Sequence, residues 1–456
     1  MNKFTKITAS IGPKCEDYDT LAQMVRAGMN VCRLNFSHDT GDVQGAKIDL
    51  IRRVASDLNT PVAVMIDLQG PKHRIGNFAT EDKYPLTIGQ KFTFDDDPTP
   101  GDATRVQLPD ADVMKSLNPG DRILLNDGKI EMTVDTVADN KIVATVVRGD
   151  EIWSRRGFNL PDTDIATSVL TPKDRADLEY AITKKPDWVA ISFVQRPEDV
   201  AEVRDFITAR TSHPIKIIAK IERPNAVERI ADIAATADGI MVARGDLAVE
   251  VPFEQVPAIS RHIIRTCRML NRPVIMATQM LGTMVTSEFP TRAEISDVAN
   301  AAYLRTDSTM TSEETTIGVN PVNVIETMAK IVTYADYDAI THPSDWLRTE
   351  NVPENDWSRS VASMAYLNHA SAIVVFARDT DIATKISCRK PDIPIIAVCR
   401  DAVVANQLCL SRGVFPICDD ALFGQRDGFN SARQFGISSG QLVIVDDEKI
   451  SLRAMD

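Results

Sequence analysis

The stretch "WVAISFVQRPEDVAEVRDFITARTSHPIKIIAKI" (residues 188–221) indicates the fold class of this chain. It opens with an apolar run at 188–194 and closes with another at 215–221, and residues 197–210 between them carry a helical pattern. Continuous apolar strands separated by helices are typical of a parallel sheet that is covered on both faces. The stretch therefore predicts one strand–helix–strand unit of an α/β fold.

The same unit recurs along the chain, with further helical patterns at 17–28 and 253–270. Eight units of this kind predict a (β/α)8 barrel. The eight apolar runs are "TKITASI" (5–11), "NVCRLNF" (30–36), "PVAVMIDL" (61–68), "WVAISFV" (188–194), "IKIIAKI" (215–221), "GIMVAR" (239–244), "PVIMAT" (273–278) and "STMTS" (308–312).

Two further regions do not follow the barrel pattern. From about 73 to 165 the sequence alternates apolar and polar residues between Gly and Asp turns, which predicts an inserted antiparallel β-barrel domain. An insertion after the third strand would lie over the mouth of the barrel, so we call this domain the lid. After about 340, alternating helix and strand patterns predict a smaller open α/β domain. The predicted domains are a barrel (1–72 and 166–340), the lid (73–165) and a C-terminal regulatory-type domain (341–456).

Composition excludes several classes of protein. The chain has 456 residues, of which 44% are hydrophobic and 25% charged, as expected for a globular protein of two or three domains. No run approaches the roughly 18 apolar residues of a membrane span, and no signal peptide is visible. The net charge of −13 opposes binding to nucleic acid or anionic membranes. Seven Cys without ligand-like spacing predict reduced thiols and a cytoplasmic location.

Polar side chains gather where the predicted strands end. In a (β/α)8 barrel these ends form the active site, and unpaired buried charge costs several kcal/mol, so their clustering indicates function. Lys220 and Glu222 lie two apart on one strand and therefore point the same way. The strand-end residues are Arg33, Asn35, Ser37, His38, Asp67, Lys72, Arg74, Ser192, Lys220, Glu222, Arg244, Asp246, Thr278, Gln279, Ser312 and Glu314.

The residue types at these ends indicate the chemistry. Glu222 and Asp246 offer hard oxygen ligands that suit Mg²⁺, or Mn²⁺, with water and substrate completing the coordination. Lys220 beside them would hold a phosphate oxygen as a compact positive charge. The turn "RGD" (244–246) offers backbone N–H groups to a carboxylate. Together they predict a small substrate that bears both phosphate and carboxylate.

Seven motifs, in order along nearly the whole chain, resemble those of the pyruvate kinase family. The resemblance implies a barrel, a lid and a C-terminal domain, usually as a homotetramer, and phosphoryl transfer from phosphoenolpyruvate to ADP as the final step of glycolysis. The motifs are "TKITASIGP", "GMNVCRLNFSH", "DLQGPKHR", "KIIAKIERPNAV", "DGIMVARGDLAVE", "RPVIMATQMLGTM" and "PTRAEISDVANA".

The resemblance also implies roles for individual residues. Lys220 matches the lysine that stabilises the phosphoryl group in flight, and Thr278 the threonine beside the enolate. Glu222 and Asp246 match the Mg²⁺ ligands. The remaining matches are Arg33 and Arg74 around the phosphoryl group, Gly245 and Ser192 at phosphoenolpyruvate, Asn35, Ser37 and Asp67 at a monovalent K⁺, and Asn35, His38, Pro13, Arg74 and Arg156 at the nucleotide.

One departure concerns K⁺. K⁺-requiring members carry a Thr-Lys pair after the Asp and a Glu where this chain has Lys72, whereas here Leu68 and Gln69 follow Asp67. This combination resembles the K⁺-independent branch. The Lys72 ammonium would supply the charge that a bound K⁺ otherwise brings, so K⁺ is not expected to be required.

Other departures leave the metal ligands and Lys220 intact. His73, Ala248, Gln195, Gly282 and Arg305 differ from the usual family residues, and Thr309, Thr311 and Glu313 stand in a normally small or apolar stretch. "ARDTDIATK" (377–385) replaces the phosphate loop of sugar-phosphate-activated members, and its Asp379 and Asp381 would repel a phosphate. We therefore expect no activation by fructose 1,6-bisphosphate at that loop.

Two alternative functions stay open on the sequence. A Mg²⁺-dependent lyase acting on a pyruvate enolate would share Lys220, Glu222 and Asp246 but would need neither a lid nor Arg74 and Lys72. A non-catalytic relative would bind metabolites without turnover, which the intact set of Lys220, Glu222, Asp246 and Thr278 argues against.

Overall fold

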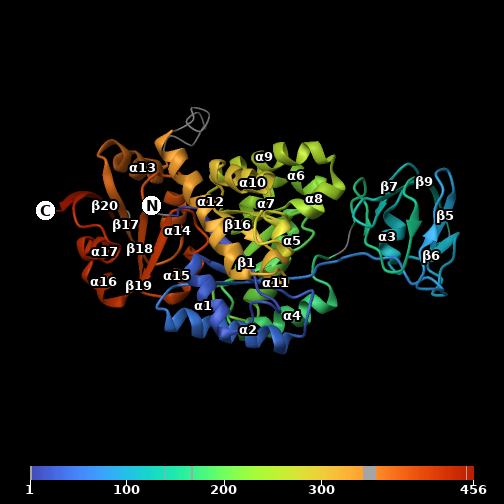
Figure 1. Cartoon of the computed structure of the whole chain (residues 1–456), viewed down its shortest axis with the longest axis horizontal. Helices are drawn as coiled ribbons and strands as arrows, with labels where there is room; N and C mark the ends of the chain where they lie inside the picture. The colour runs from blue at the N-terminus through green and yellow to red at the C-terminus, as the bar shows by residue number, and fades with distance from the viewer. Residues whose placement is uncertain (1–2, 139, 166–167, 343–355, 448, 456) are drawn as a thin grey trace.

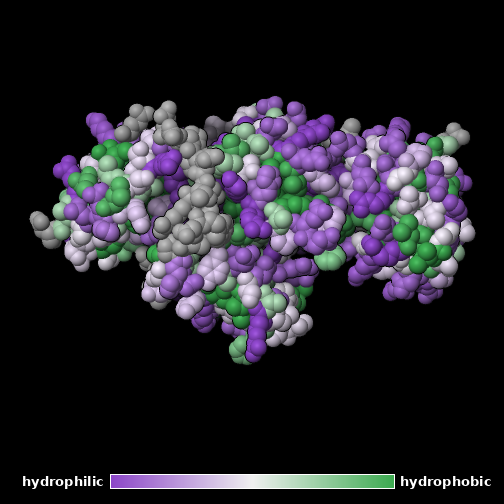
Figure 2. All heavy atoms as spheres, turned by 90° about the horizontal axis from the view of Figure 1, so that it is seen from above, coloured by the Kyte–Doolittle hydropathy of each residue, from purple (hydrophilic) through white to green (hydrophobic). Residues whose placement is uncertain are grey.

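The computed structural model describes residues 3–138, 140–165, 168–342, 356–447 and 449–455. Three bodies follow one another along the long axis of the molecule (Figure 1). The barrel occupies the centre, the lid lies at one end and the C-terminal domain at the other. The space-filling view shows a mostly polar face across all three bodies (Figure 2).

The central body is a closed barrel of eight parallel strands, in the order β1-β16-β15-β14-β13-β12-β3-β2. This confirms the predicted (β/α)8 barrel, and each predicted apolar run contains one strand. The strands are β1 (Lys6–Ser10), β2 (Val31–Asn35), β3 (Ala63–Asp67), β12 (Trp188–Ile191), β13 (Lys216–Ile221), β14 (Gly239–Ala243), β15 (Val274–Ala277) and β16 (Ser308–Thr311).

Helices surround this barrel and bury their apolar faces against its strands. Several begin with strong local signals: Thr171 and Asp174 form a capping box at α4, and Thr291 and Glu294 form one at α10. The helices are α1 (Tyr18–Ala27), α2 (Gly41–Asp57), α4 (Pro172–Thr183), α5 (Pro197–Thr208), α6 (Pro224–Glu228), α7 (Ile230–Thr236), α8 (Arg244–Glu250), α9 (Val256–Met269), α10 (Arg292–Tyr303), α11 (Glu313–Thr316) and α12 (Pro321–Thr341), with short 3₁₀ turns η1 (Phe253–Gln255) and η2 (Gly282–Val285).

Strand β16 is polar yet fully buried, and its hydroxyl groups are all bonded. Ser308 Oγ lies 2.8 Å from Thr8 Oγ1, Thr309 Oγ1 lies 3.1 Å from Met328 Sδ, and Thr311 Oγ1 lies 3.2 Å from Thr315 Oγ1. The unusual Thr309 and Thr311 are therefore accommodated at no cost in unpaired polar groups.

The lid is inserted between β3 and α4 and has its own apolar core. Its main sheet has the order β11-β7-β8-β9-β5-β6. All neighbours are antiparallel except β5 and β6, a parallel pair that the sequence did not reveal. The elements are β4 (Tyr84–Pro85), β5 (Lys91–Asp95), β6 (Arg105–Gln107), α3 (Ala111–Ser116), β7 (Arg122–Leu125), β8 (Ile130–Ala138), β9 (Lys141–Arg148), β10 (Glu151–Ile152) and β11 (Phe158–Asn159).

The C-terminal domain is the predicted open α/β unit, with a sheet of order β19-β18-β17-β20-β21. Only the edge strand β21 runs antiparallel to its neighbour. The elements are α13 (Trp357–Leu367), β17 (Ala370–Ala377), α14 (Asp381–Cys388), β18 (Ile395–Cys399), α15 (Ala402–Leu408), β19 (Val414–Cys418), α16 (Asp420–Gln425), α17 (Gly428–Gln434), β20 (Gly440–Asp446) and β21 (Lys449–Met455).

The C-terminal domain closes the amino end of the barrel. Cys409 and Leu410 pack in the same apolar cluster as Met65, Ile218 and other residues of the barrel interior. Ion pairs surround this contact, with Lys390 Nζ 2.6 Å from Asp307 Oδ1 and Arg412 Nη2 2.7 Å from Asp336 Oδ1. The carboxyl ends of the strands are therefore left facing the lid.

The junction also accounts for one departure from the family pattern. Arg305 is buried there and donates from Nη1 to Lys390 O at 2.8 Å and to Asp392 Oδ1 at 2.6 Å. The structure gives no account of Gly282, Ala248 or Glu313.

Candidate active site

Lys220 lies at the centre of a buried polar cluster at the carboxyl end of β13. Its Nζ lies 2.7 Å from Ser192 Oγ, 3.2 Å from Asp67 Oδ1 and 3.1 Å from Glu222 Oε1. Ser192 donates its own hydroxyl proton to Leu68 O at 2.8 Å, so its oxygen is free to accept from Lys220. Burial lowers the pKa of Lys220, but Asp67 and Glu222 outweigh it and the pKa is raised overall. Lys220 therefore stays a cation at any physiological pH.

Asp67 holds two cations together. Its Oδ2 accepts from Arg33 Nε at 2.8 Å and lies 2.7 Å from Arg33 Nη2, while Oδ1 faces Lys220. Arg33 also donates from Nη1 to Ser10 Oγ at 2.9 Å. Burial raises the pKa of Asp67, but Lys220 and Arg33 outweigh that effect and lower the pKa overall. Ion pairs thus link the ends of β2, β3 and β13, and a hydrogen bond to Ser10 adds the end of β1.

Glu222 and Asp246 form the acidic side of the cluster. Glu222 is 1% exposed and its Oε2 accepts from Phe193 N at 2.8 Å. Burial has the largest effect on the pKa of Glu222 and raises it. Lys220 lowers this pKa and the nearby charge of Asp246 raises it, so that the pKa is raised overall. The Asp246 carboxylate accepts no hydrogen bond from any residue that the structure describes.

This donor set fits a divalent cation that takes most of its ligands from elsewhere. Within the described ranges, no group of three or more His, Cys, Asp or Glu side chains is arranged to hold a metal. The carboxylates of Glu222 and Asp246 suit Mg²⁺, because Mg²⁺ commonly needs few protein ligands and completes its coordination with water and substrate oxygens.

Thr278 is held in a strained conformation at the end of β15. Its φ of 71° is unusual for a β-branched residue, and such strain clusters at functional sites. Gly245 N donates to Thr278 Oγ1 at 2.7 Å, which joins the ends of β14 and β15. Arg244 donates to Thr278 O at 2.7 Å and pairs with Asp297 at 2.8 Å, so Arg244 supports the loop rather than facing a substrate.

Four further predicted residues lie at or just after the carboxyl ends of β1 and β2. Asn35 pairs with Asp67 across β2 and β3, and Ser37 N donates to Asn35 Oδ1 at 3.1 Å. Pro13 is exposed, and His38 bonds through its backbone, with N donating to Asn35 O at 3.3 Å and O accepting from Gln44 Nε2 at 3.0 Å.

Three predicted cations lie apart from the cluster, at the base of the lid. Arg74 donates from Nη1 to Arg155 O at 3.1 Å, and the Arg156 guanidinium lies 4.9 Å from the Trp153 ring centre. Lys72 is exposed. Among the described residues, none of the three forms a hydrogen bond or ion pair with the Lys220 cluster.

Sequence reasoning missed a second buried group that anchors the lid. Arg223 Nη2 donates to Leu160 O at 2.6 Å and to Thr163 O at 3.0 Å, and its Nε lies 3.4 Å from Glu250 Oε2. Asn159 donates to Glu250 Oε1 at 3.0 Å. The one signal in the sequence for this anchoring role was that Arg223 directly follows Glu222, a predicted metal ligand.

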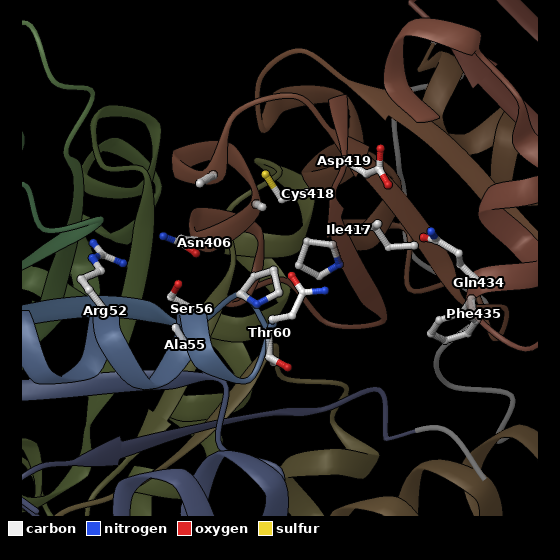
Figure 3. Close-up of a pocket in the computed structure, with 15 residues that line it drawn as sticks. Arg52, Ala55, Ser56, Thr60, Asn406, Ile417, Cys418, Asp419, Gln434 and Phe435 are labelled. Atoms are coloured by element: carbon white, nitrogen blue, oxygen red, sulfur yellow. The ribbon is translucent and has the colours of Figure 1, made fainter. Parts of the chain in front are cut away.

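A cavity of about 600 Å³ lies elsewhere, between α2 of the barrel and the C-terminal domain (Figure 3). Arg52 and Ser56 line one side, and Asn406, Cys418 and Phe435 line the other. It lies beyond the amino end of the barrel and contains none of the predicted catalytic residues.

Comparisons with known proteins match nearly the whole chain to one family. Residues 2–325 match the family model for the pyruvate kinase barrel domain, and residues 355–448 match that for its alpha/beta domain. The pyruvate kinase of Methylorubrum extorquens is 39% identical over 417 residues, which cover 91% of this chain and 86% of the relative. That of Agrobacterium vitis is 37% identical, covering 97% and 95%.

A crystal structure of a pyruvate kinase from Cryptosporidium parvum superposes with a TM-score of 0.93 at 29% identity, covering 100% of this chain and 96% of that one. Because family models match well over half of the chain and curated relatives exceed 35% identity along most of it, this chain belongs to the pyruvate kinase family of phosphotransferases.

Proposed function

We propose that this enzyme transfers the phosphoryl group of phosphoenolpyruvate to ADP, giving pyruvate and ATP at the end of glycolysis. The observation that carries the proposal is the buried Lys220 ammonium, 3.1 Å from Glu222 and electrostatically coupled to Asp246 at the carboxyl end of the barrel. Phosphoryl transfer needs positioning and neutralisation of charge more than covalent chemistry, and this cluster offers both.

Each residue has a defined task in this proposal. Glu222 and Asp246 would hold Mg²⁺ or Mn²⁺, which when bound supplies positive charge to the phosphoryl oxygens. Lys220, with Arg33 and Arg74, stabilises the negative charge that the group gathers in flight. The phosphoenolpyruvate carboxylate binds near Gly245 N and Ser192. Thr278, whose hydroxyl already bonds to Gly245 N, lies beside the enolate that takes up a proton.

The nucleotide is assigned to the rim between barrel and lid. Arg74 and Arg156 at the base of the lid would face the phosphates of ADP, with Asn35, His38 and Pro13 on the barrel side. Arg156 is supported against Trp153, which leaves its planar guanidinium ready for bidentate contact with phosphate oxygens.

We also propose that the enzyme does not require K⁺. Asp67, which with Asn35 and Ser37 stands at the monovalent-cation positions, already contacts Arg33 and Lys220, so it attracts a further cation weakly. Lys72 brings a tethered charge close to the same rim. The next side chain after Asp67, Leu68, is buried and apolar and offers no ligand.

A coupled assay with lactate dehydrogenase tests the function, the K⁺ proposal and the rival lyase together. Phosphoenolpyruvate, ADP and Mg²⁺ in tetramethylammonium buffer should give ATP and pyruvate at a rate that added K⁺ changes by less than about twofold, while K72M lowers that rate about tenfold. Strong activation by K⁺ would refute K⁺ independence. Pyruvate formed without ADP would instead favour the lyase.

Regulation and assembly are proposed from the C-terminal domain and the surface. In "ARDTDIATK", Asp379 Oδ1 accepts from Asp381 N at 2.8 Å, and Lys216 of the barrel donates to Thr380 Oγ1, so the loop is acidic and already bonded. Fructose 1,6-bisphosphate added to the assay should leave the phosphoenolpyruvate curve unmoved.

We propose a cytoplasmic homotetramer. Exposed apolar side chains on neighbouring elements near α11 and α12, with Phe289 78%, Ile317 52% and Val319 54% exposed, support a subunit contact there. Sedimentation equilibrium would measure the assembly, and a monomer at micromolar concentration would contradict it. In the described part of the chain, no helix combines the length and apolar content needed to cross a bilayer.

A further inference from the structure

The segment that links the barrel to the lid has two separate anchors. The barrel anchor ends at Gly70, which has a φ of 69°, donates to Asp174 Oδ1 at 3.2 Å and packs so closely on Ser192 that a Cβ would lie 2.9 Å from Ser192 Cβ. The lid anchor begins at His73. Only Pro71 and Lys72 lie between the two anchors, so the position of Lys72 depends on both.

His73 attaches this segment to the body of the lid. Its Nδ1 lies 2.7 Å from Asp110 Oδ2, and its ring side chain is 11% exposed. Asp110 is the N-cap of α3, where its Oδ1 accepts from Asp112 N and Val113 N, both at 3.2 Å. The hydrogen bond from His73 is the largest of the effects that lower the pKa of Asp110. Because α3 packs into the lid core, the His73 ring follows the lid rather than the barrel.

The backbone around His73 is extended and paired on the lid side. His73 O accepts from Phe158 N at 3.0 Å, Ile75 N donates to Arg156 O at 3.1 Å, and Gly76 N donates to Gln107 O at 2.7 Å. Arg74 and Gly157 form an antiparallel bridge. These bonds and the single bridge tie residues 73–76 to the lid.

Successive side chains of an extended segment point to opposite faces. His73 and Ile75 accordingly face the lid, where Ile75 is buried in the apolar core, whereas Arg74 between them is exposed, as is Lys72. The Lys72 ammonium forms no hydrogen bond or ion pair with any described residue. Its direction is therefore set by the backbone, which is held on the lid side by the backbone bonds of residues 73–76 and by the His73 side chain.

We propose that the His73–Asp110 pair is a latch that couples the adjacent Lys72 to the lid, so that His73 is a positioning residue for phosphoryl transfer. This inference rests on the proposed role of Lys72 as the tethered replacement for K⁺. When the lid moves, Asp110 moves with it and the contact with Asp110 takes His73 along. Lys72 follows because it is adjacent to His73 in the chain. Loss of the latch removes the side-chain contact that holds the residue next to Lys72, and misplaced charge costs transition-state stabilisation.

The test uses the full-length enzyme in K⁺-free buffer. H73A should lower kcat about tenfold. H73N, whose side-chain amide keeps a donor near the position of Nδ1, should recover most of that loss. D112N changes an exposed carboxylate in the first turn of the same helix and should leave kcat within about twofold of the wild type. Melting temperatures of all variants report whether the lid stays folded, and H73N keeps the test open where H73A does not fold.

The decisive comparison is H73A in the wild-type and K72M backgrounds. A latch that acts through Lys72 predicts that H73A has almost no further effect once K72M is present. An equal loss in both backgrounds, no recovery in H73N, or unchanged kcat in H73A would each overturn the inference. The proposed function is judged separately, from the response of the wild-type enzyme to K⁺. Repeating the comparison of backgrounds in saturating K⁺ distinguishes failure of the latch from failure of the proposal that K⁺ is not required.

Discussion

At the scale of single residues, the arrangement depends on one ammonium group surrounded by carboxylates. We expect K220M to lower kcat by about three orders of magnitude, since a buried charge that faces the phosphoryl group is worth about 4 kcal/mol in the transition state. Phosphoenolpyruvate binding, followed by fluorescence titration, should weaken far less. K216M removes a lysine from the other end of the same strand and is the control. A turnover within tenfold of the wild type in K220M would contradict the role of Lys220.

Part of this cluster followed from the sequence, and part did not. The spacing of two residues placed Lys220 and Glu222 on one face of a strand, and the structure finds their charged atoms 3.1 Å apart. The pairing of His73 with Asp110, and of Arg223 with Leu160 and Thr163, joins segments tens of residues apart. No local pattern encodes such contacts, because they depend on how the lid folds back onto the barrel.

At the scale of elements, the return connection of the lid is held by Arg223. R223M would leave the Glu250 carboxylate buried without its cationic partner and would remove the side-chain donor to the carbonyls of Leu160 and Thr163, at a cost of about 3–5 kcal/mol. We expect faster hydrogen exchange over residues 158–165 and a lower melting temperature. R229M removes a half-exposed partner of Asp164, 3.7 Å away, and should change either measure little. Equal exchange in both variants would show that Arg223 is not the anchor.

The elements themselves were largely readable in the sequence. Eight apolar runs correctly predicted eight parallel strands, because strands buried on both faces leave a continuous apolar signal. The parallel pairing of β5 with β6 was not predictable, since alternation of apolar residues fixes which face is buried but not the direction of the neighbour. Strands β19 and β21 were also missed: β19 is only partly buried and β21 lies at the sheet edge with four exposed residues.

At the scale of the whole molecule, the two ends of the barrel are used differently. The amino end is closed by the C-terminal domain through a charged junction, and the carboxyl end carries the cluster around Lys220. The predicted domain boundaries at 72/73, 165/166 and 340/341 stay predictions, and residues 166–167 lie outside the described ranges. Because charged side chains are buried at the junction, we expect the stability of the protein to depend on pH through them.

Lys6 at this junction gives a prediction about pH and stability. Its ammonium is buried, donates to Val414 O and lies 4.4 Å from the Phe415 ring centre, and burial lowers its pKa to about 8 against the opposing effects of Cys409 and Asp336. The unfolded chain binds a proton at Lys6 up to its ordinary pKa of 10.5, so between pH 8 and 10.5 the unfolded state holds more protons there. Stability from Lys6 therefore rises with pH across this window.

K6M abolishes the contribution of Lys6, and it also removes a neighbouring charge that helps to lower the pKa of Lys3. Comparing urea unfolding at pH 7 and pH 9.5, we expect the wild type to gain about 2 kcal/mol over K6M at the higher pH, from roughly 1.4 kcal/mol per pH unit above 8. K83M alters an exposed lysine of the lid, 51% exposed, and should show no such pH-dependent difference from the wild type. A difference between wild type and K6M that is the same at both pH values would mean that Lys6 remains fully charged at the junction, and that its contact with the C-terminal domain outweighs the cost of burying it.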